Sequence, residues 1–266
     1  MSHWKIKLME ENQASENEKD LSNKEVINTL KKKNWKSYFK EFFMLFLAVF
    51  CGFLAENYRE SLSVNKVEKD YILSLIEDLK TDTSNLKAYI TFRKEKSILM
   101  DSLAEMLLSE DRRLLGNQIY YLARQVFNDQ PFFYSDGTIQ QLKNAGNLRL
   151  LRKRNVVNEL LKYEKNVKVL EEWDDNDNRT KSTFREMGGK VFHSSELNAT
   201  MDSEMKFIMP TTNPQLITDD FSVINEIAFQ IHYLSKMTKG NSLRAESLKS
   251  DAARLLDLIH SEYKLN

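Results

Sequence analysis

An uncharged apolar run over residues 42–55 constrains the fold of this chain more than any other feature. Nine of its fourteen positions are Phe, Leu or Val. As an α-helix the run would rise about 21 Å, which is short of the roughly 30 Å hydrocarbon core of a bilayer. Length alone therefore favours a buried helix of a soluble protein, or the apolar part of a signal peptide.

Three further observations favour a membrane span. Each Phe, Leu or Val contributes about −0.3 to −0.6 kcal/mol near the bilayer centre, and together they contribute roughly −3 to −5 kcal/mol. The run has no polar face, which an amphipathic helix of a soluble domain needs. Aromatic and lysine side chains flank it as interface anchors: Trp35, Lys36, Tyr38 and Lys40 precede it and Tyr58 follows it. We therefore predict an uncleaved transmembrane helix over residues 35–58.

A buried soluble helix and a cleaved or lipidated signal are the alternatives. Forty-one residues precede the run, which is too many for the charged region of a signal peptide. The bulky Phe50 stands before Cys51, where a lipidated cysteine would need a small residue. An anchored chain is therefore the favoured interpretation.

Basic residues predict the orientation of the span. Five lysines precede the run, at positions 31, 32, 33, 36 and 40, whereas Arg59 is the only basic residue within ten positions after it. The positive-inside rule then places the N-terminus in the cytoplasm and the chain from about residue 59 outside. In a bacterium this means the inner membrane and the periplasm.

The chain divides into three predicted parts. Residues 1–34 are polar and predict a disordered cytoplasmic tail, with a juxtamembrane helix beginning near residue 24. Residues 35–58 form the signal-anchor helix, and residues 59–266 form a periplasmic helical domain. With only seven Gly and three Pro, the sequence disfavours strand-and-turn architectures and predicts an all-α fold.

Apolar periodicity predicts the helices beyond the span. A stripe at spacings of three, four and seven predicts that the span continues as one long helix to about Leu108, and this helix would need partners from its own chain or another. The stripe consists of Ile72, Leu75, Ile76, Leu79, Leu86, Ile90, Ile98, Leu99, Leu103 and Met106. Further helices are expected over residues 112–127, 156–187, 219–237 and 241–263, with Gly188–Gly189 ending the second and Gly240 separating the last two.

The segment between the second and third long helices carries turn signals. Asp136–Gly137 predicts a turn, Thr138 with Gln141 predicts a capping box, and Gly146 predicts the end of a short helix. Residues 190–218 are expected to be mostly loop. An antiparallel helical bundle is the predicted packing.

Two motifs carry a resemblance to a known group. The first is the short aromatic span followed by 55-AENYRE-60 and 77-EDLKTDT-83, and the second is 138-TIQQLKNAGNLRLLRKRNVV-157. Together they resemble an uncharacterised group of single-span membrane proteins from Bacteroidota, over about residues 36–165. The resemblance implies the same topology and a bacterial envelope location, and it implies no catalytic residue.

Several classes of activity find no support in the residues. Formal net charge is zero, so no basic field indicates nucleic acid. The single Cys51 excludes an intramolecular disulfide and zinc or redox cysteine pairs. The stretch 174-DDNDNRT-180 begins like a calcium loop, but Arg179 and Arg185 stand where Gly and Glu are required. We expect no cofactor, no metal site and no catalytic constellation.

Two candidate interaction sites remain. The first is a possible ligand or partner patch in which aromatic side chains precede a basic cluster: Phe132, Phe133, Tyr134, Arg149, Arg152 and Arg154. Its alternatives are a plug of the bundle core and a charged turn. The second is Ala48, Gly52 and Glu56, which share one face of the span and could contact another helix in the membrane. The alternative for Glu56 is a carboxylate at the water interface.

The predicted function is a membrane-anchored periplasmic module that binds or scaffolds. Its partners would be membrane lipid together with a second copy of the chain or another envelope protein. The alternatives are a sensor-like domain with a small ligand near residues 131–154 and, less favoured, an envelope enzyme. A closed pocket lined by Phe132, Tyr134 and Arg149 would favour the sensor, whereas an exposed apolar stripe would favour assembly.

Overall fold

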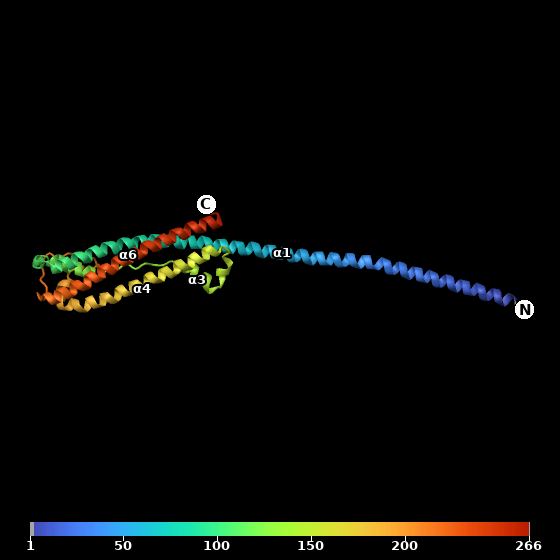
Figure 1. Ribbon diagram of the computed structural model, residues 1–266, viewed down its shortest axis with the longest axis horizontal. Coiled ribbons are helices and arrows are strands. Elements are labelled where there is room, and N and C mark those ends of the chain that lie inside the picture. The colour runs from blue at the N-terminus through green and yellow to red at the C-terminus, as the bar shows by residue number, and fades with distance from the viewer. Residues whose placement is uncertain (1–2, 266) are drawn as a thin grey trace. The chain divides into compact units, whose positions relative to one another are not determined.

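The computed structural model describes the backbone of residues 3–265 and the side chains of residues 9–26 and 35–265. Within that part of the chain the regular elements are helices, and one isolated bridge joins Met201 to Phe207. The elements are α1 (His3–Leu108), η1 (Glu110–Leu114), α2 (Gly116–Gln125), α3 (Gly137–Asn144), η2 (Asn147–Leu150), α4 (Arg154–Val191), α5 (Ser194–Asn198) and α6 (Phe221–Tyr263) (Figure 1). The predicted all-α fold is confirmed.

The chain forms two compact units, Met1–Lys66 and Val67–Asn266, referred to below as unit 1 and unit 2. In unit 1 the chain is helical from His3, where the sequence predicted a disordered tail. Residues 3–34 contain no Gly or Pro and are rich in the strong helix formers Glu and Lys. The apolar run extends the same helix, so the tail does not need its own nucleus. The lysines at 31–33 fall outside the described side chains.

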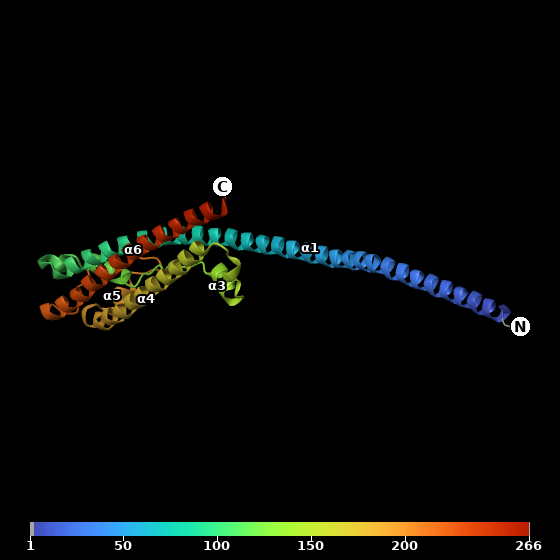
Figure 2. The ribbon, with the colours of Figure 1, turned by 45° about the vertical axis from the view of Figure 1, so that its right-hand side comes forward.

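In unit 2, α4 runs in the same direction as α1. At the start of the unit, Glu68 of α1 accepts hydrogen bonds from the backbone and guanidinium of Arg152, just before α4. Further along both helices, Arg93 of α1 donates to Asp177 of α4 at 2.6 Å. The partners therefore advance together along the two helices. Figures 1 and 2 show α4 running in the same direction as the unit 2 part of α1, away from the end that carries α3.

An extended segment, residues 128–136, returns the chain between these two parallel helices. The Asn128 carbonyl accepts from Lys96, and the Ser135 N–H donates to Asp82 at 2.8 Å. The segment therefore lies along α1 in the opposite direction. The segment carries the chain back to the start of unit 2 before α4 begins. Helix α4 can therefore run in the same direction as α1.

The last helix, α6, runs opposite to α1 and α4. Tyr263 near its end donates to Glu68, whereas Ser235 in its first half donates to the Ser97 carbonyl. Helix α6 is therefore antiparallel to α1 and α4, and the three long helices pack with mixed directions instead of the predicted antiparallel order. Hydrophobic periodicity specifies which face of a helix is buried, but it does not specify the direction of the helix.

Helix α6 is unbroken where the sequence predicted two helices. Gly240 lies inside it, and the neighbouring Asn241 and Ser242 are buried instead of capping a new helix. A helical glycine costs only about 1 kcal/mol relative to alanine, and packing of the apolar face on both sides exceeds that cost. For the same reason α4 passes through Gly188–Gly189 and ends at Val191.

The core of unit 2 consists of two apolar clusters. The first joins the early part of unit 2 in α1 to α3, the first half of α4 and the second half of α6, and the second joins the later part of α1 to α2, the end of α4 and the first half of α6. The predicted stripe on α1 lies in these clusters except at Ile98, which is 64% exposed. Ser97 and Met100 take the inward positions there, so the helix phase turns Ile98 outward.

Candidate functional site

The predicted aromatic and basic patch is divided between core and surface. Phe132 is buried in the first apolar cluster, and Tyr134 packs edge-on against Tyr163 with ring centroids 6.1 Å apart. Phe133 is exposed. Phe132 and Tyr134 therefore fill the core, which is the alternative to a ligand patch for these aromatics. Of the three aromatic residues, only Phe133 stays available to a partner.

The basic members of the patch also separate. All three arginines are exposed, but only Arg152 forms an ion pair with the buried Glu68, at 2.7 Å. Burial by itself raises the pKa of Glu68, but hydrogen bonds from Arg152 and Tyr263 hold that pKa below its usual range. Arg152 therefore serves to neutralise a buried carboxylate.

The two motifs that carry the resemblance contact each other in unit 2. Asp78 and Asp82 of the EDLKTDT stretch accept the backbone N–H groups of Thr138 and Ser135. These bonds correct the predicted capping box, because the donors at the start of α3 are satisfied by α1 and not by Gln141. Burial raises the pKa of Asp82, although the hydrogen bonds from Ser135 and from Tyr163 oppose that shift.

A buried ionic layer separates the two apolar clusters. Arg93 is 1% exposed and donates to Asp174 at 2.8 Å and to Asp177 at 2.6 Å. Its guanidinium also lies 4.8 Å from the centre of the Tyr89 ring. Burial raises the pKa of both carboxyls, although the positive charge of Arg93 opposes that shift. Asn241 of α6 donates to Asp174 at 3.2 Å, so the layer joins three helices.

Two further cations complete the layer around Asp129. Lys181 lies 2.6 Å from the Asp129 carboxylate, and Lys96 and Arg93 each lie 3.7 Å from it. The six charges Arg93, Lys96, Lys181, Asp129, Asp174 and Asp177 balance. Burial raises the pKa of Asp129, but Lys96 and Lys181 together lower it below its usual value. The layer is thus neutral when all six groups are charged, but Arg93 Nε and Asp177 Oδ1 are buried without a hydrogen-bond partner among the described residues.

Lys96 gives a testable pH dependence of stability. Its burial, followed by the nearby charge of Lys181, lowers the pKa of Lys96 from 10.5 to about 7. Between these values the unfolded chain holds a proton at Lys96 that the folded chain lacks, so the free energy of unfolding rises with pH. Urea unfolding of the purified full chain between about pH 7 and 9.5 should show this rise, and Lys96→Met should abolish it.

Lys94→Met is the matched control for that experiment. Lys94 lies on the same helix, is half exposed and pairs with Glu246 at the surface at 2.6 Å. Its loss should leave the pH slope unchanged. A slope that persists without Lys96 would contradict the assignment, since it would come from other titrating groups.

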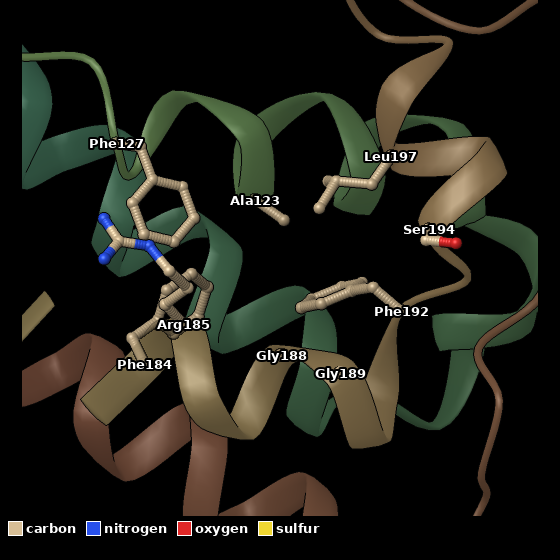
Figure 3. A pocket seen from close by; sticks show the side chains of 9 residues that line it. All are labelled: Ala123, Phe127, Phe184, Arg185, Gly188, Gly189, Phe192, Ser194 and Leu197. Atoms are coloured by element: carbon tan, nitrogen blue, oxygen red, sulfur yellow. The ribbon is translucent and has the colours of Figure 1, made fainter. Parts of the chain in front are cut away.

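A cavity of about 130 Å³ lies in unit 2 between α2, the end of α4 and α5. The cavity is lined mainly by apolar groups: Ala123, Phe127, Phe184, Arg185, Gly188, Gly189, Phe192, Ser194 and Leu197. In Figure 3, Ala123 and Leu197 lie across the space from the helix that carries the two glycines. The cavity is partly open to solvent, so a small molecule can enter it.

The two glycines keep one wall of this cavity free of side chains. A Cβ atom at Gly188 would meet only Phe192, at an ordinary 3.8 Å, and one at Gly189 would meet no atom within 4 Å. Each glycine costs about 1 kcal/mol of helix stability relative to alanine. Packing does not require glycine at either position, and their effect is to leave space.

The predicted membrane run is uncovered throughout. Each side chain from residue 35 to 63 is exposed, including the interface anchors Trp35 and Tyr58. Helix α1 carries a stretch that is long and apolar enough to cross a membrane by length and composition. On the face proposed for helix contact, Glu56 forms an exposed ion pair with Arg59 at 2.6 Å. Glu56 thus has a partner within its own helix.

Comparison with protein-family models, curated proteins and solved structures found no match to this chain. Among the described residues, no group of three or more His, Cys, Asp or Glu side chains could hold a metal ion.

The ionic layer and the cavity are the two features that the sequence reasoning missed. Arg93 and Lys96 do carry a signal, because they fall in phase with the buried Leu86, Tyr89 and Met100. Charged residues in a core stripe indicate a paired buried charge. The cavity carries a weaker signal in the glycine pair inside a helical pattern, which the prediction took for a helix end.

Proposed function

We propose that the protein is a membrane-anchored helical module of a bacterial cell envelope that binds a protein partner. Residues 42–55 would cross the inner membrane once, with the N-terminus in the cytoplasm and unit 2 in the periplasm. The observation that carries the proposal is the fully exposed apolar run, which precedes in the sequence a unit that has its own buried core.

The exposure of the run supports insertion. Soluble monomers rarely expose contiguous apolar patches of this size, since water makes them costly. Phe42, Phe46 and Phe50 stack one turn apart along one face of the helix, with no other described residue covering them. Lipid is the solvent that suits such a surface, and the anchors Trp35, Lys36, Tyr38, Lys40 and Tyr58 would lie at its interfaces.

Exposed apolar residues on unit 2 support a partner. Phe229 and Tyr233 lie one turn apart on α6 and are 63% and 53% exposed. A short surface loop adds Met205, Ile208 and Met209. Aromatic and methionine side chains are enriched at protein interfaces. A second copy and another envelope protein are both compatible with this surface.

One observation supports the sensor alternative, but at a different location from the expected one. Its ligand was expected near residues 131–154, where the aromatics fill the core. The cavity beside Gly188 is a different location in the same unit. The two alternatives are compatible, because an anchored module could bind both a ligand and a partner.

Thiol labelling of single-cysteine variants tests the proposed topology. In a Cys51→Ala background, Ser203→Cys places a thiol on an exposed turn of unit 2 and Ser15→Cys places one on the exposed tail. In cells with a permeable outer envelope, a membrane-impermeant maleimide should label the first variant, and it should label the second only after lysis. Labelling of Ser15→Cys alone in intact cells would indicate the opposite orientation and would contradict a periplasmic unit 2.

The same variants test the partner. An impermeant cross-linker applied to the Ser203→Cys cells should shift the protein to a discrete larger species. The Phe229→Ser/Tyr233→Ser change should reduce that species if α6 contributes the surface. A protein that stays a monomer under these conditions, with the label in place, would contradict a binding role.

A further inference from the structure

The cavity beside Gly188 has the character of a ligand site and is separate from the membrane run. All its lining residues belong to unit 2. Three phenylalanines, Phe127, Phe184 and Phe192, supply aromatic walls, with the rings of Phe127 and Phe184 5.4 Å apart and those of Phe184 and Phe192 6.4 Å apart. Apolar walls with a few polar groups are typical of small-molecule sites.

The volume limits what can enter. An apolar cavity of roughly 150 Å³ in another protein accepts benzene, and the 130 Å³ here is comparable. The ligand's buried part is therefore about one aromatic ring or a short alkyl chain. Any larger or polar part must lie on the open side.

Arg185 favours a negative charge on the outer part of the ligand. Its guanidinium lies over the Phe127 ring, 5.1 Å from the centroid, at the edge of the cavity (Figure 3). No described residue forms an ion pair or hydrogen bond with Arg185, and no carboxylate lines the cavity. The Ser194 hydroxyl is the other polar group of the lining. A positive charge at the rim of an apolar cavity favours a ligand with an anionic head.

We propose that this cavity binds a small amphiphilic carboxylate, with its ring or short chain among the phenylalanines and its carboxylate beside Arg185. The glycines at 188 and 189 fit this role, because a side chain at either position would occupy the ligand's space without clashing with the protein. The proposal goes beyond membrane anchoring and does not depend on it.

Fluorine NMR of the full chain in lipid nanodiscs tests the proposal with 4-fluorobenzoate as the probe. We expect saturable broadening with a dissociation constant on the order of 0.1–1 mM, which suits a ligand of about ten heavy atoms. Gly188→Leu or Gly189→Leu should abolish the broadening while the protein remains folded by circular dichroism. Gly240→Ala, a glycine of α6 away from the cavity, should leave it unchanged.

A neutral probe separates the charge from the cavity. Arg185→Gln should weaken 4-fluorobenzoate about tenfold and leave 4-fluorobenzyl alcohol unchanged, whereas Arg179→Gln, an exposed arginine of α4 outside the lining, should affect neither. Broadening that is unsaturable, or that persists at the wild-type level in Gly188→Leu and Gly189→Leu, would overturn the site. Equal affinities for the two probes in wild type would overturn the anionic ligand. Neither result bears on membrane insertion.

Discussion

Replacing Arg93 with methionine should lower the free energy of unfolding by about 3–5 kcal/mol, the range found when one partner of a buried ion pair is removed. Arg93 neutralises Asp174 and Asp177, of which Asp177 is 0% exposed. Methionine resembles the arginine stem in volume and contributes no hydrogen bond. The loss would therefore come from two uncompensated carboxylates and not from a cavity.

Urea unfolding of the full chain, followed by circular dichroism, measures this effect. Lys94→Met is the control, since its surface ion pair should contribute less than about 1 kcal/mol. In the double variant, Asp177→Asn removes one of the stranded charges. The double variant should then be less destabilised than the sum of the two single changes. Additive losses would show that Arg93 and Asp177 are not coupled.

The ionic layer also explains why three long helices adopt one register. Apolar clusters alone tolerate sliding of one helix along another, because many apolar contacts are nearly equivalent. The layer contacts α1, α4 and α6 at one level through Arg93, Asp174 and Asn241. A shift of one turn would leave buried charges unpaired. A buried polar group that specifies register at some cost in stability has precedent in coiled coils.

Periodicity predicted most of the helices but not their order in space. The stripe on α1 and the buried faces of α4 and α6 follow from spacings of three and four. The parallel direction of α1 and α4 depends on the extended return over residues 128–136. Its bonds are made by Asp82 and Lys96, which lie far away in the sequence. No local pattern encodes a pairing of that kind.

The candidate sites were less predictable than the fold. Aromatic residues in a loop can either line a pocket or fill a core. The contacts of Phe132 and Tyr134 show that these two residues fill the core. A glycine pair can either end a helix or open space beside it, and tertiary packing decides this at Gly188. Both choices depend on residues that become neighbours only after folding.

Two aspartates in the apolar run should remove the protein from the membrane. Phe46 and Phe50 lie one turn apart near the middle of the run, with ring centroids 5.9 Å apart. Exchanging each for Asp costs about 3–4 kcal/mol at the bilayer centre. The pair costs roughly 6–8 kcal/mol, which exceeds the −3 to −5 kcal/mol that the whole run contributes. Insertion should therefore fail in Phe46→Asp/Phe50→Asp.

Carbonate extraction of cell membranes measures insertion, and unit 2 provides a matched control. Phe229 and Tyr233 have the same spacing and are also exposed aromatics, so Phe229→Asp/Tyr233→Asp should stay in the pellet with the wild type. The control distinguishes a lipid-facing surface from a protein-facing one. An apolar run that served as a soluble dimer interface would leave even the wild-type chain extractable by carbonate, because no bilayer would hold it. Extraction of the wild type would therefore refute the span, whatever the aspartates do.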